Sequence, residues 1–216
     1  MKKHQVRIVG GEYRRTPIPV IEAEHLRPTP DRVRETLFNW LSHFWDGAFA
    51  DKRVLDLFAG TGALGFEAAS RGVAHARLVE CSPAALAALR KLQIRLGATA
   101  RVSIHAGDAL AFLRAQSGPE YDLLLLDPPF HQGWIERLWP LLGRALRPGG
   151  LAYIETEGTL RDFPPAFSLL REARAGQVHV LLLQFAALQK TMNNPETWPS
   201  PTPGGPPPND NDTETA

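Results

Sequence analysis

The stretch that most constrains this chain is a run of four leucines at residues 123–126. An unbroken apolar run of this length suits a strand that is buried on both faces, as in a parallel sheet covered by helices. An acid, two prolines and an aromatic follow directly, as Asp127-Pro128-Pro129-Phe130. Neither proline has an N–H to donate, and Pro129 holds Pro128 in an extended backbone. The run therefore predicts a strand that ends in a stiff turn presenting acceptors, unless the prolines only stop the sheet.

Strands and helices alternate from residue 53 onward, and this alternation sets the fold class. The apolar patterns predict strands at 53–57, 76–80, 101–105, 121–127 and 151–156, and helices at 62–71, 83–96, 108–116 and 133–146. Repeated strand–helix units specify an α/β fold with a doubly wound, mostly parallel sheet. Two later stretches, 168–173 and 178–185, are joined by Ala175-Gly176 and predict an antiparallel pair.

The two ends of the chain differ from this central pattern. Residues 5–20 predict a short arginine-rich hairpin, and Thr29-Pro30 begins an amphipathic helix that we expect to dock through its apolar stripe and leave its arginines free. Residues 1–34 hold eight Lys or Arg against four acids, and residues 191–216 hold four acids and no Lys or Arg. The last segment is rich in proline, so we expect it to be disordered. Three parts are expected: an extension at 1–50, an α/β domain at 51–190 and a tail at 191–216.

Composition limits the compartment and the cofactor class. A single cysteine, Cys81, excludes an internal disulfide and favours a reducing compartment. The seven histidines have no metal-ligand spacing, so no metal site is expected. No apolar run approaches the roughly 20 residues that span a bilayer, and no signal peptide is recognisable. We expect a soluble, cytoplasmic protein, and a monomer.

A glycine-rich turn follows the first predicted strand of the alternation. Gly60, Gly62 and Gly65 have the spacing of a dinucleotide-binding turn, and Glu80 ends the next strand. By itself this motif indicates a nicotinamide-dependent oxidoreductase. Asp56 argues against that interpretation, because a carboxylate inside the strand would repel a pyrophosphate and attract an ammonium or sulfonium group. The Asp127–Phe130 turn also has no role in hydride transfer.

Taken in order, these motifs resemble those of the class I S-adenosylmethionine-dependent methyltransferases: residues 56–65, Glu80, Gly107-Asp108-Ala109 and residues 127–130. The amino-terminal stretches 7–13 and 26–41, with residues 175–178, are similar to the bacterial 16S ribosomal RNA guanine-N2 methyltransferases. The resemblance covers about residues 6–187 and says nothing of the tail.

The resemblance implies a fold, a cofactor and a substrate. It implies a Rossmann-like methyltransferase domain at 51–190, S-adenosylmethionine as cofactor, and a guanine 2-amino group of 16S ribosomal RNA as acceptor, in a small ribosomal subunit or an assembly intermediate. The implied cofactor-binding residues are Asp56, Phe58, Gly60, Thr61, Gly62, Glu80, Cys81, Asp108 and Ala109. The implied catalytic residues are Asp127, Pro128, Pro129 and Phe130, and the implied RNA-binding residues are Arg7, Arg14, Arg15, Arg27 and Arg32.

Other interpretations stay open at this point. Asp108 is also a favoured helix N-cap, Phe130 could be a core residue that closes the turn, and each arginine could be only a solvated side chain. The alternatives for the whole chain are a DNA or other-RNA amino-methyltransferase, a nicotinamide-dependent oxidoreductase, and a non-catalytic RNA-binding protein. Intact acceptors at residues 127–130 favour an enzyme over the last of these.

Overall fold

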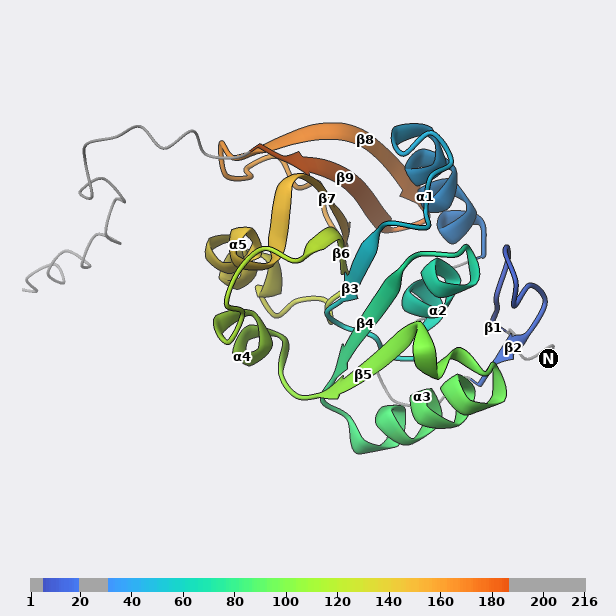
Figure 1. Ribbon diagram of the computed structural model, residues 1–216. Helices are drawn as coiled ribbons and strands as arrows, with labels where there is room; N and C mark the ends of the chain where they lie inside the picture. The colour runs from blue at the N-terminus through green and yellow to red at the C-terminus, as the bar shows by residue number, and fades with distance from the viewer. Residues whose placement is uncertain (1–5, 20–30, 187–216) are drawn as a thin grey trace, which may run out of the picture.

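The computed structural model describes residues 6–19 and 31–186, which are built around one seven-stranded sheet (Figure 1). The order of the strands is β5-β4-β3-β6-β7-β9-β8. Their bounds are β3 (Arg53–Asp56), β4 (His75–Glu80), β5 (Val102–Ala106), β6 (Tyr121–Leu126), β7 (Leu146–Thr156), β8 (Phe167–Ala175) and β9 (Val178–Phe185). Neighbours from β5 to β7 are parallel, and β9 is antiparallel to both β7 and β8. The predicted doubly wound, mostly parallel sheet is confirmed.

Helices cover both faces of the sheet. Their bounds are α1 (Asp31–Phe44), α2 (Ala63–Ser70), α3 (Pro83–Arg95), α4 (Ala109–Arg114) and α5 (Trp134–Ala145), with a short 3-10 helix at Ala98–Ala100. Side chains of α1, α2 and α3 share one buried cluster with the sheet, and those of α4 and α5 share another. In Figure 1 α1 and α2 lie to the right of the sheet, α3 lies below β5, and α4 and α5 lie to the left.

The leucine run is the centre of this arrangement. All four leucines of β6 are fully buried, with Leu123 and Leu125 in the cluster of α1–α3 and Leu124 and Leu126 in that of α4–α5. Alternate side chains of a strand point to opposite faces, so a strand between two helical layers must be apolar on both. Burial of one leucine stabilises the fold by about 1.5–3 kcal/mol, so the four leucines anchor β6 firmly between the two helical layers.

The amino-terminal hairpin packs on the end of α2. Its strands are β1 (Val6–Arg7) and β2 (Pro17–Ile18), which pair antiparallel as predicted but over only two residues each. Gly11 has φ +77°, and a Cβ there would lie 1.9 Å from the carbonyl oxygen of Ser70. Tyr13 N also donates to Ser70 Oγ at 2.8 Å. The hairpin loop therefore contacts α2 backbone against backbone.

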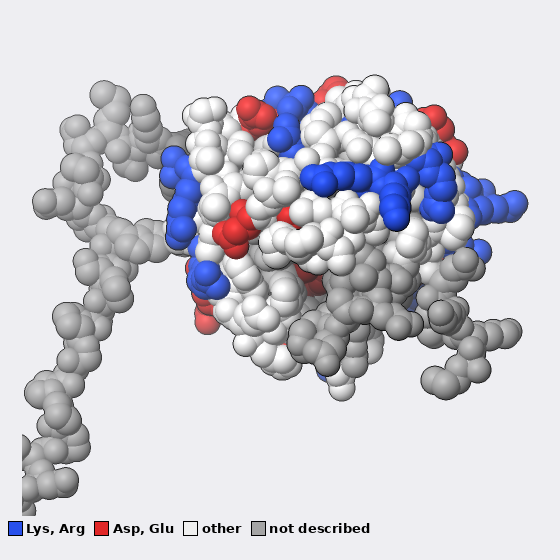
Figure 2. All heavy atoms as spheres, turned by 90° about the horizontal axis from the view of Figure 1, so that it is seen from below, with Lys and Arg blue, Asp and Glu red and all other residues white. Residues whose placement is uncertain are grey.

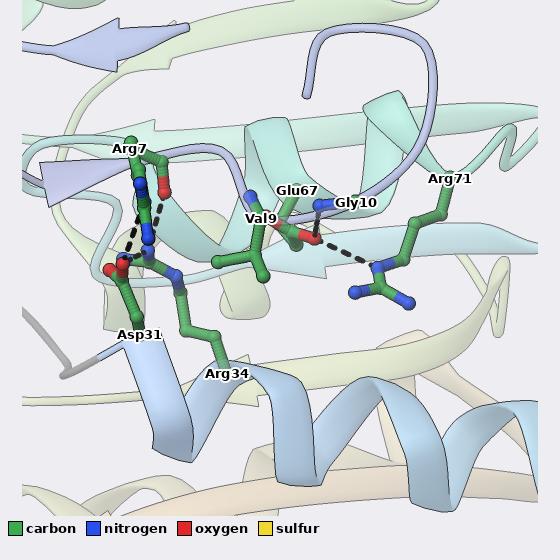
Figure 3. Close-up of polar contacts among 7 residues, drawn as sticks. All are labelled: Arg7, Val9, Gly10, Asp31, Arg34, Glu67 and Arg71. Atoms are coloured by element: carbon green, nitrogen blue, oxygen red, sulfur yellow. Dashed lines mark hydrogen bonds and ion pairs between the residues drawn. The ribbon is translucent and has the colours of Figure 1, made fainter. Parts of the chain in front are cut away.

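Two buried charged side chains hold the hairpin and α1 to this layer (Figure 3). The Glu67 carboxylate in α2 is fully buried and accepts from Val9 N at 2.7 Å and Gly10 N at 2.8 Å. It also accepts from Arg71 Nε at 2.8 Å. The guanidinium of Arg34 in α1 is equally buried and donates to Asp31 Oδ1 at 2.7 Å and to the Arg7 carbonyl at 2.5 Å.

The expectation that this extension leaves its arginines free is wrong for two of them. Arg7 Nε pairs with Asp31 at 3.1 Å, and Arg34 lies in the core. The cause is Asp31 at the first position of α1, which draws both guanidinium groups to the start of that helix. Arg14, Arg15 and Arg32 are exposed. Arg27 lies outside the described residues, as does the tail expected at 191–216.

In the carboxyl-terminal half most boundaries lie within two residues of prediction, and the largest departure is at the start of β7. The helix expected to reach residue 146 ends at Ala145, and β7 begins at Leu146 rather than at residue 151. Leu146 pairs with Tyr121, and a register shift follows before Leu123 pairs with Leu151. The sequence Pro148-Gly149-Gly150 indicates a turn, but here it forms an irregular stretch within the strand.

Candidate active site

Four acidic residues lie at the carboxyl ends of neighbouring parallel strands. Asp56 is the last residue of β3 and Glu80 the last of β4. Asp108 follows the end of β5 by two residues, and Asp127 follows β6 directly. Because these strands are consecutive in the sheet and parallel, their ends lie along one edge. The sheet thus brings together the residues predicted from separate motifs.

The glycine turn begins immediately after β3. Gly60 and Gly62 have φ +51° and +80°, in the left-handed region that favours glycine. A Cβ on Gly62 would lie 2.6 Å from the side chains of Leu89 and Phe66. A Cβ on Gly65 would lie 2.6 Å from Leu78, so this glycine lets α2 pack closely on β4. The turn therefore has both the backbone conformation and the close packing that the motif predicts.

Asp56 is a buried carboxyl group beneath this turn. It is 1% exposed, and its Oδ2 accepts from Gly65 N at 3.0 Å. Its Oδ1 is buried without a hydrogen-bond partner among the described residues. Burial raises the pKa of Asp56 to about 7, a shift that the backbone amides of Gly65 and Phe58 partly offset. An orphaned acceptor of this kind suits a cationic ligand group.

Glu80 joins the glycine turn to the exit of β4. Its Oε2 accepts from Gly60 N at 2.8 Å, and its Oε1 accepts from Cys81 N at 2.9 Å and Ser82 N at 2.7 Å. These amides use three of the roughly four acceptor positions of a carboxylate. Glu80 is thus held by backbone amides rather than being a solvated strand end, with one acceptor position left for a ligand hydroxyl.

The neighbouring residues at this edge have local roles that the structure defines. Cys81 is exposed, and partial burial of the thiol together with the charge of Glu80 raises its pKa, which keeps it protonated at neutral pH. Asp108 Oδ1 accepts from Ala111 N at 2.9 Å, so Asp108 is the N-cap of α4. Ala109 is buried directly behind it. The N-cap interpretation of Asp108 is confirmed, and it leaves the other carboxylate oxygen available.

The Asp127-Pro128-Pro129-Phe130 turn borders a cavity of about 220 Å³. Pro128 is buried, Pro129 is exposed, and Asp127 and Phe130 are half-buried. The cavity is lined by residues 128–136, which follow β6, and residues 155–160, which end and follow β7. The strand exit is therefore one wall of a pocket, and the exits of two adjacent strands enclose it.

Two contacts between His131 and Glu157 hold the two walls together. His131 has φ +60°, which is uncommon for a residue with a side chain. Its backbone N–H donates to Glu157 Oε1 at 2.7 Å, and its Nε2 lies 2.6 Å from Glu157 Oε2. These two contacts fix the loop after β6 against the loop after β7.

Aromatic side chains connect this pocket to the glycine turn. Phe58, beside that turn, meets Trp134 at the start of α5 edge-on, with ring centroids 5.2 Å apart. The Arg137 guanidinium lies over the Trp134 ring at 4.4 Å. Phe58 was predicted as a cofactor contact, but Trp134 was not predicted at all. Its position in the first turn of the helix after the D-P-P-F motif is the signal that could have identified it.

Glu155 was also missed, and it lies at the floor of the pocket. It is 3% exposed and accepts from Tyr153 Oη at 2.9 Å. Burial, with the charges of Glu155 and Asp127, raises the pKa of Tyr153 well above its ordinary value, so the phenol remains a donor. The strand-end rule applied to 53–80 would have found Glu155, because β7 is the next parallel strand after β6.

Metal binding and membrane crossing can be judged for the described residues alone. Within 6–19 and 31–186, no group of three or more His, Cys, Asp and Glu side chains is arranged to hold a metal ion. Among the helices of the same ranges, none is both long and apolar enough to cross a bilayer.

The sheet order, the glycine turn after β3 and the acids at successive strand ends define a class I methyltransferase fold. An RNA methyltransferase from Salinibacter ruber, solved with S-adenosyl-L-homocysteine, shares this fold at a TM-score of 0.54 and 21% identity, covering 74% of this chain and 95% of that one. The yhhF protein of Escherichia coli is more similar, with a TM-score of 0.75 and 40% identity over 85% of this chain and 99% of its own.

Sequence comparison identifies the family. The family model described as conserved hypothetical protein 95 matches residues 6–184. Ribosomal RNA small subunit methyltransferase D of Escherichia coli K12 is 42% identical over 184 residues, which are 83% of this chain and 90% of that protein. The Haemophilus influenzae protein of the same name is 38% identical and covers 84% and 95%. The chain belongs to the family of ribosomal RNA small subunit methyltransferase D.

Proposed function

We propose that this protein transfers a methyl group from S-adenosylmethionine to the 2-amino group of a guanine in 16S ribosomal RNA. The observation that carries the proposal is the acceptor-rich exit of β6, one strand from the glycine turn, in a chain of this family. The substrate would be met in a small ribosomal subunit or an assembly intermediate. We further propose that the enzyme acts as a cytoplasmic monomer.

The residues at the edge of the sheet fit S-adenosylmethionine. Asp56, with its orphaned buried Oδ1, and the backbone of the turn at Phe58, Gly60, Thr61 and Gly62 would hold the methionine end. Glu80 would accept from the ribose hydroxyls beside Cys81. Asp108 and the Ala109 amide would read the adenine edge. When bound there, the cofactor supplies an electrophilic methyl group on a sulfonium.

The chain's own contribution to methyl transfer is positioning and electrostatics. The 2-amino nitrogen of guanine is a weak nucleophile because its lone pair is delocalised into the ring. The Asp127 carboxylate and the Pro128 carbonyl would accept from the two amino hydrogens, which favours a pyramidal nitrogen with a localised lone pair. Pro129 keeps both acceptors rigid, so little reorganisation is needed in the transition state. Asp127 can also take the proton that the methylated amine releases.

The pocket between the loops after β6 and β7 would receive the base. Its volume of about 220 Å³ and its half-buried Phe130 suit a planar group that has left its stack. An aromatic ring provides a face on which any base stacks, while Asp127 and Pro128 select an exocyclic amine. The interpretation of Phe130 as only a core residue would leave the pocket without a stacking surface at the catalytic turn.

The parts of the chain divide these tasks. We propose residues 1–50 as the RNA-docking extension, 51–190 as the methyltransferase domain and 191–216 as an appended acidic tail. Arg7, Arg14, Arg15, Arg27 and Arg32 would contact phosphates, and for Arg7 this contact would compete with its pair to Asp31. Phosphate contacts orient an RNA without reading its sequence.

The test is nucleoside mass spectrometry of 16S ribosomal RNA from cells that lack this protein. We expect the loss of one N2-methylguanosine, and its return with the wild-type gene but not with Asp127→Ala. Truncation of a transition-state contact of this kind lowers kcat about a hundredfold or more while leaving cofactor affinity intact. The matched control is Asp51→Ala, an exposed carboxylate at the opposite edge of the sheet, before β3. An unchanged nucleoside profile, or binding of a nicotinamide dinucleotide in place of S-adenosylmethionine, would refute the proposal.

A further inference from the structure

A groove lies between the hairpin and α3, away from the catalytic turn. Its volume is about 440 Å³, and it is lined by Arg14, Arg15, Thr16, Pro17, Arg95 and Leu96. Arg95 of α3 donates to the carbonyl of Pro17, so the helix and the hairpin form one continuous surface. The hairpin residues Arg14 and Arg15 thus line the same groove as the end of α3.

Most of the described charged side chains around this groove are basic. The last two turns of α3 add the exposed side chains of Arg90 and Lys91 to that of Arg95, and α3 contains no acid. Arg101 is neutralised by Glu12 at 2.9 Å. Among the described residues no acid pairs with the other basic side chains, which are Arg14, Arg15, Arg90, Lys91 and Arg95. Figure 2, which views the molecule from the side of α3, shows Lys and Arg gathered in a band on this face.

Helix stabilisation explains only part of this charge. A cation in the last turn interacts favourably with the helix dipole, and Arg95 occupies that position. Arg90 and Lys91 lie a turn earlier, where the dipole effect has decayed. A merely solvated helix face usually carries both signs of charge. Between these cations Ile94 is 72% exposed, an apolar side chain that suits a sugar–base surface better than a free anion.

The position of α3 separates this surface from the reacting base. The helix begins at Pro83, three residues after Glu80, and runs back for 13 residues toward the amino edge of the sheet. There Gln93 Nε2 donates to the Val102 carbonyl at the start of β5. At 1.5 Å per residue the basic turns, from Arg90 to Arg95, are roughly 10–18 Å from the cofactor end of the helix.

We propose that the hairpin loop and the last two turns of α3 form a second binding surface for phosphates of the RNA substrate, remote from the methylated nucleotide. This inference rests on the proposed function and assigns α3 a role that the sequence did not predict. The surface would hold a neighbouring segment of the same RNA, and so set which guanine reaches the pocket. The partner follows from charge complementarity, since a row of exposed cations that pair with no acid among the described residues matches a phosphate backbone.

The experiment compares the double variant Arg90→Ala/Lys91→Ala with Arg114→Ala/Arg144→Ala. Arg114 and Arg144 are exposed on α4 and α5, in the layer on the other side of the sheet, so the control removes the same charge elsewhere. Both full-length proteins are assayed for methylation of small subunits and of protein-free 16S ribosomal RNA across a salt series. Arg95 is left intact because it also holds the hairpin.

We expect the α3 variant to raise KM for both RNA substrates roughly tenfold, with kcat, cofactor affinity and melting temperature unchanged. Each lost phosphate contact should reduce the log–log salt slope by about 0.7–0.9, hence by about 1.4–1.8 in all. The charge-preserving exchange Arg90→Lys/Lys91→Arg should leave KM and the salt slope at their wild-type values.

Three outcomes would decide against the inference. Equal KM and salt slope in the α3 variant, the control and the wild type would mean that α3 is a solvated face. A loss confined to assembled subunits would assign the surface to a ribosomal protein instead. A fall in kcat at unchanged KM would exclude a docking role. Absence of methylation by the wild type itself would refute the proposed function, and is therefore distinct from these results.

Discussion

At the scale of single residues, the carboxyl groups of the site differ in what the protein does to their charge. Asp56 is sealed under the glycine turn with a pKa raised to about 7, whereas Glu80 receives three backbone amides. A bound cation would favour the ionised form of Asp56. Glu80 already accepts hydrogen bonds that hold the glycine turn and the exit of β4. Both were predicted as cofactor contacts, and each has a consequence for stability that the motif alone does not contain.

Asp56→Asn should remove a pH-dependent destabilisation. The unfolded carboxyl group ionises above about 3.8 and the folded one only above about 7, so the folded state retains a proton between these values. Wild-type stability should therefore fall as pH rises through this window and level off above it, by at most about 4 kcal/mol. The variant lacks this component because the Asn amide does not ionise. Its amide oxygen can still accept from Gly65, so the fold is retained.

Urea unfolding of both proteins without cofactor at several values between pH 4 and pH 8 measures this difference. The gap in favour of Asp56→Asn should grow with pH. The pH dependence of cofactor affinity should have the opposite sign to that of stability. The affinity of the wild type for S-adenosylmethionine should rise with pH across neutrality, and the variant should bind weakly at every pH. Parallel stability profiles would show that the carboxyl group is ionised throughout.

Glu80→Gln separates the structural from the ligand-binding role of that residue. The amide retains one acceptor oxygen, but its NH2 group confronts backbone donors, so the melting temperature should fall. Loss of a charge-assisted hydrogen bond worth about 1.5–3 kcal/mol should also weaken cofactor binding tenfold or more. Calorimetry and thermal unfolding measure the two effects. A lower melting temperature at unchanged affinity would reduce Glu80 to a clasp for the glycine turn.

At the scale of elements, the hairpin depends on α2 more than on its own strands. Two paired residues per strand cannot hold a hairpin in water, and the Glu67 carboxylate replaces the missing ladder by accepting from two of its amides. The helix that begins at the glycine turn therefore also carries the amino-terminal extension. A change in the position of α2 would be transmitted to both.

Glu67→Gln should destabilise the protein by about 3 kcal/mol or more. It breaks a buried ion pair with Arg71 and turns a donor group toward a backbone N–H. Chemical denaturation measures the loss, and protease cleavage within residues 6–19 reports whether the hairpin detaches first. Glu35→Gln, on the exposed face of α1, is the control and should match the wild type. A Glu67 variant as stable as this control would show that the Glu67 carboxylate does not hold the hairpin to α2.

The types of the elements were predictable because the hydrophobic periodicity agrees with the capping and turn residues along most of the chain. The alternation from residue 53, the Ser82 cap and the final antiparallel pair all follow from local chemistry. The start of β7 did not, since a Pro-Gly-Gly segment is a turn in most contexts and a strand only beside Tyr121. Buried Arg34 and Glu67 were missed for a similar reason: charge predicts exposure until a partner from a distant segment is known.

The residues of the candidate site were predictable where they lie at the carboxyl ends of predicted strands. Acids at predicted strand ends, together with the family resemblance, identified Asp56, Glu80, Asp108 and Asp127, because parallel strands bring such residues to one edge. The Phe58–Trp134 ring contact and the His131–Glu157 contact depend on how two loops fold over that edge. No local pattern specifies such packing, so only the structure places them.

At the scale of the whole molecule, the described core is complete at β9. Phe185 pairs with Phe167 of β8, and their rings lie 5.1 Å apart. Removal of residues 191–216 should therefore leave melting temperature and turnover unchanged, since that acidic, proline-rich sequence has little apolar surface to bury. A truncation that also removes β9 should not fold. A measurable loss on removing only the tail would indicate that it docks, for which the cations around α3 are the complementary surface.

The adjacency of β3 and β6 has a consequence for how such enzymes diversify. Asp56 lies opposite Leu125, so the cofactor turn and the D-P-P-F turn leave the sheet one strand spacing apart, about 4.8 Å. The spacing of the two turns is thus set by the backbone pairing of the sheet and not by any side chain. The proposed base pocket, in contrast, is lined by the loops at 128–136 and 155–160. Changes in those loops would therefore alter the pocket while the spacing of the two turns stays fixed.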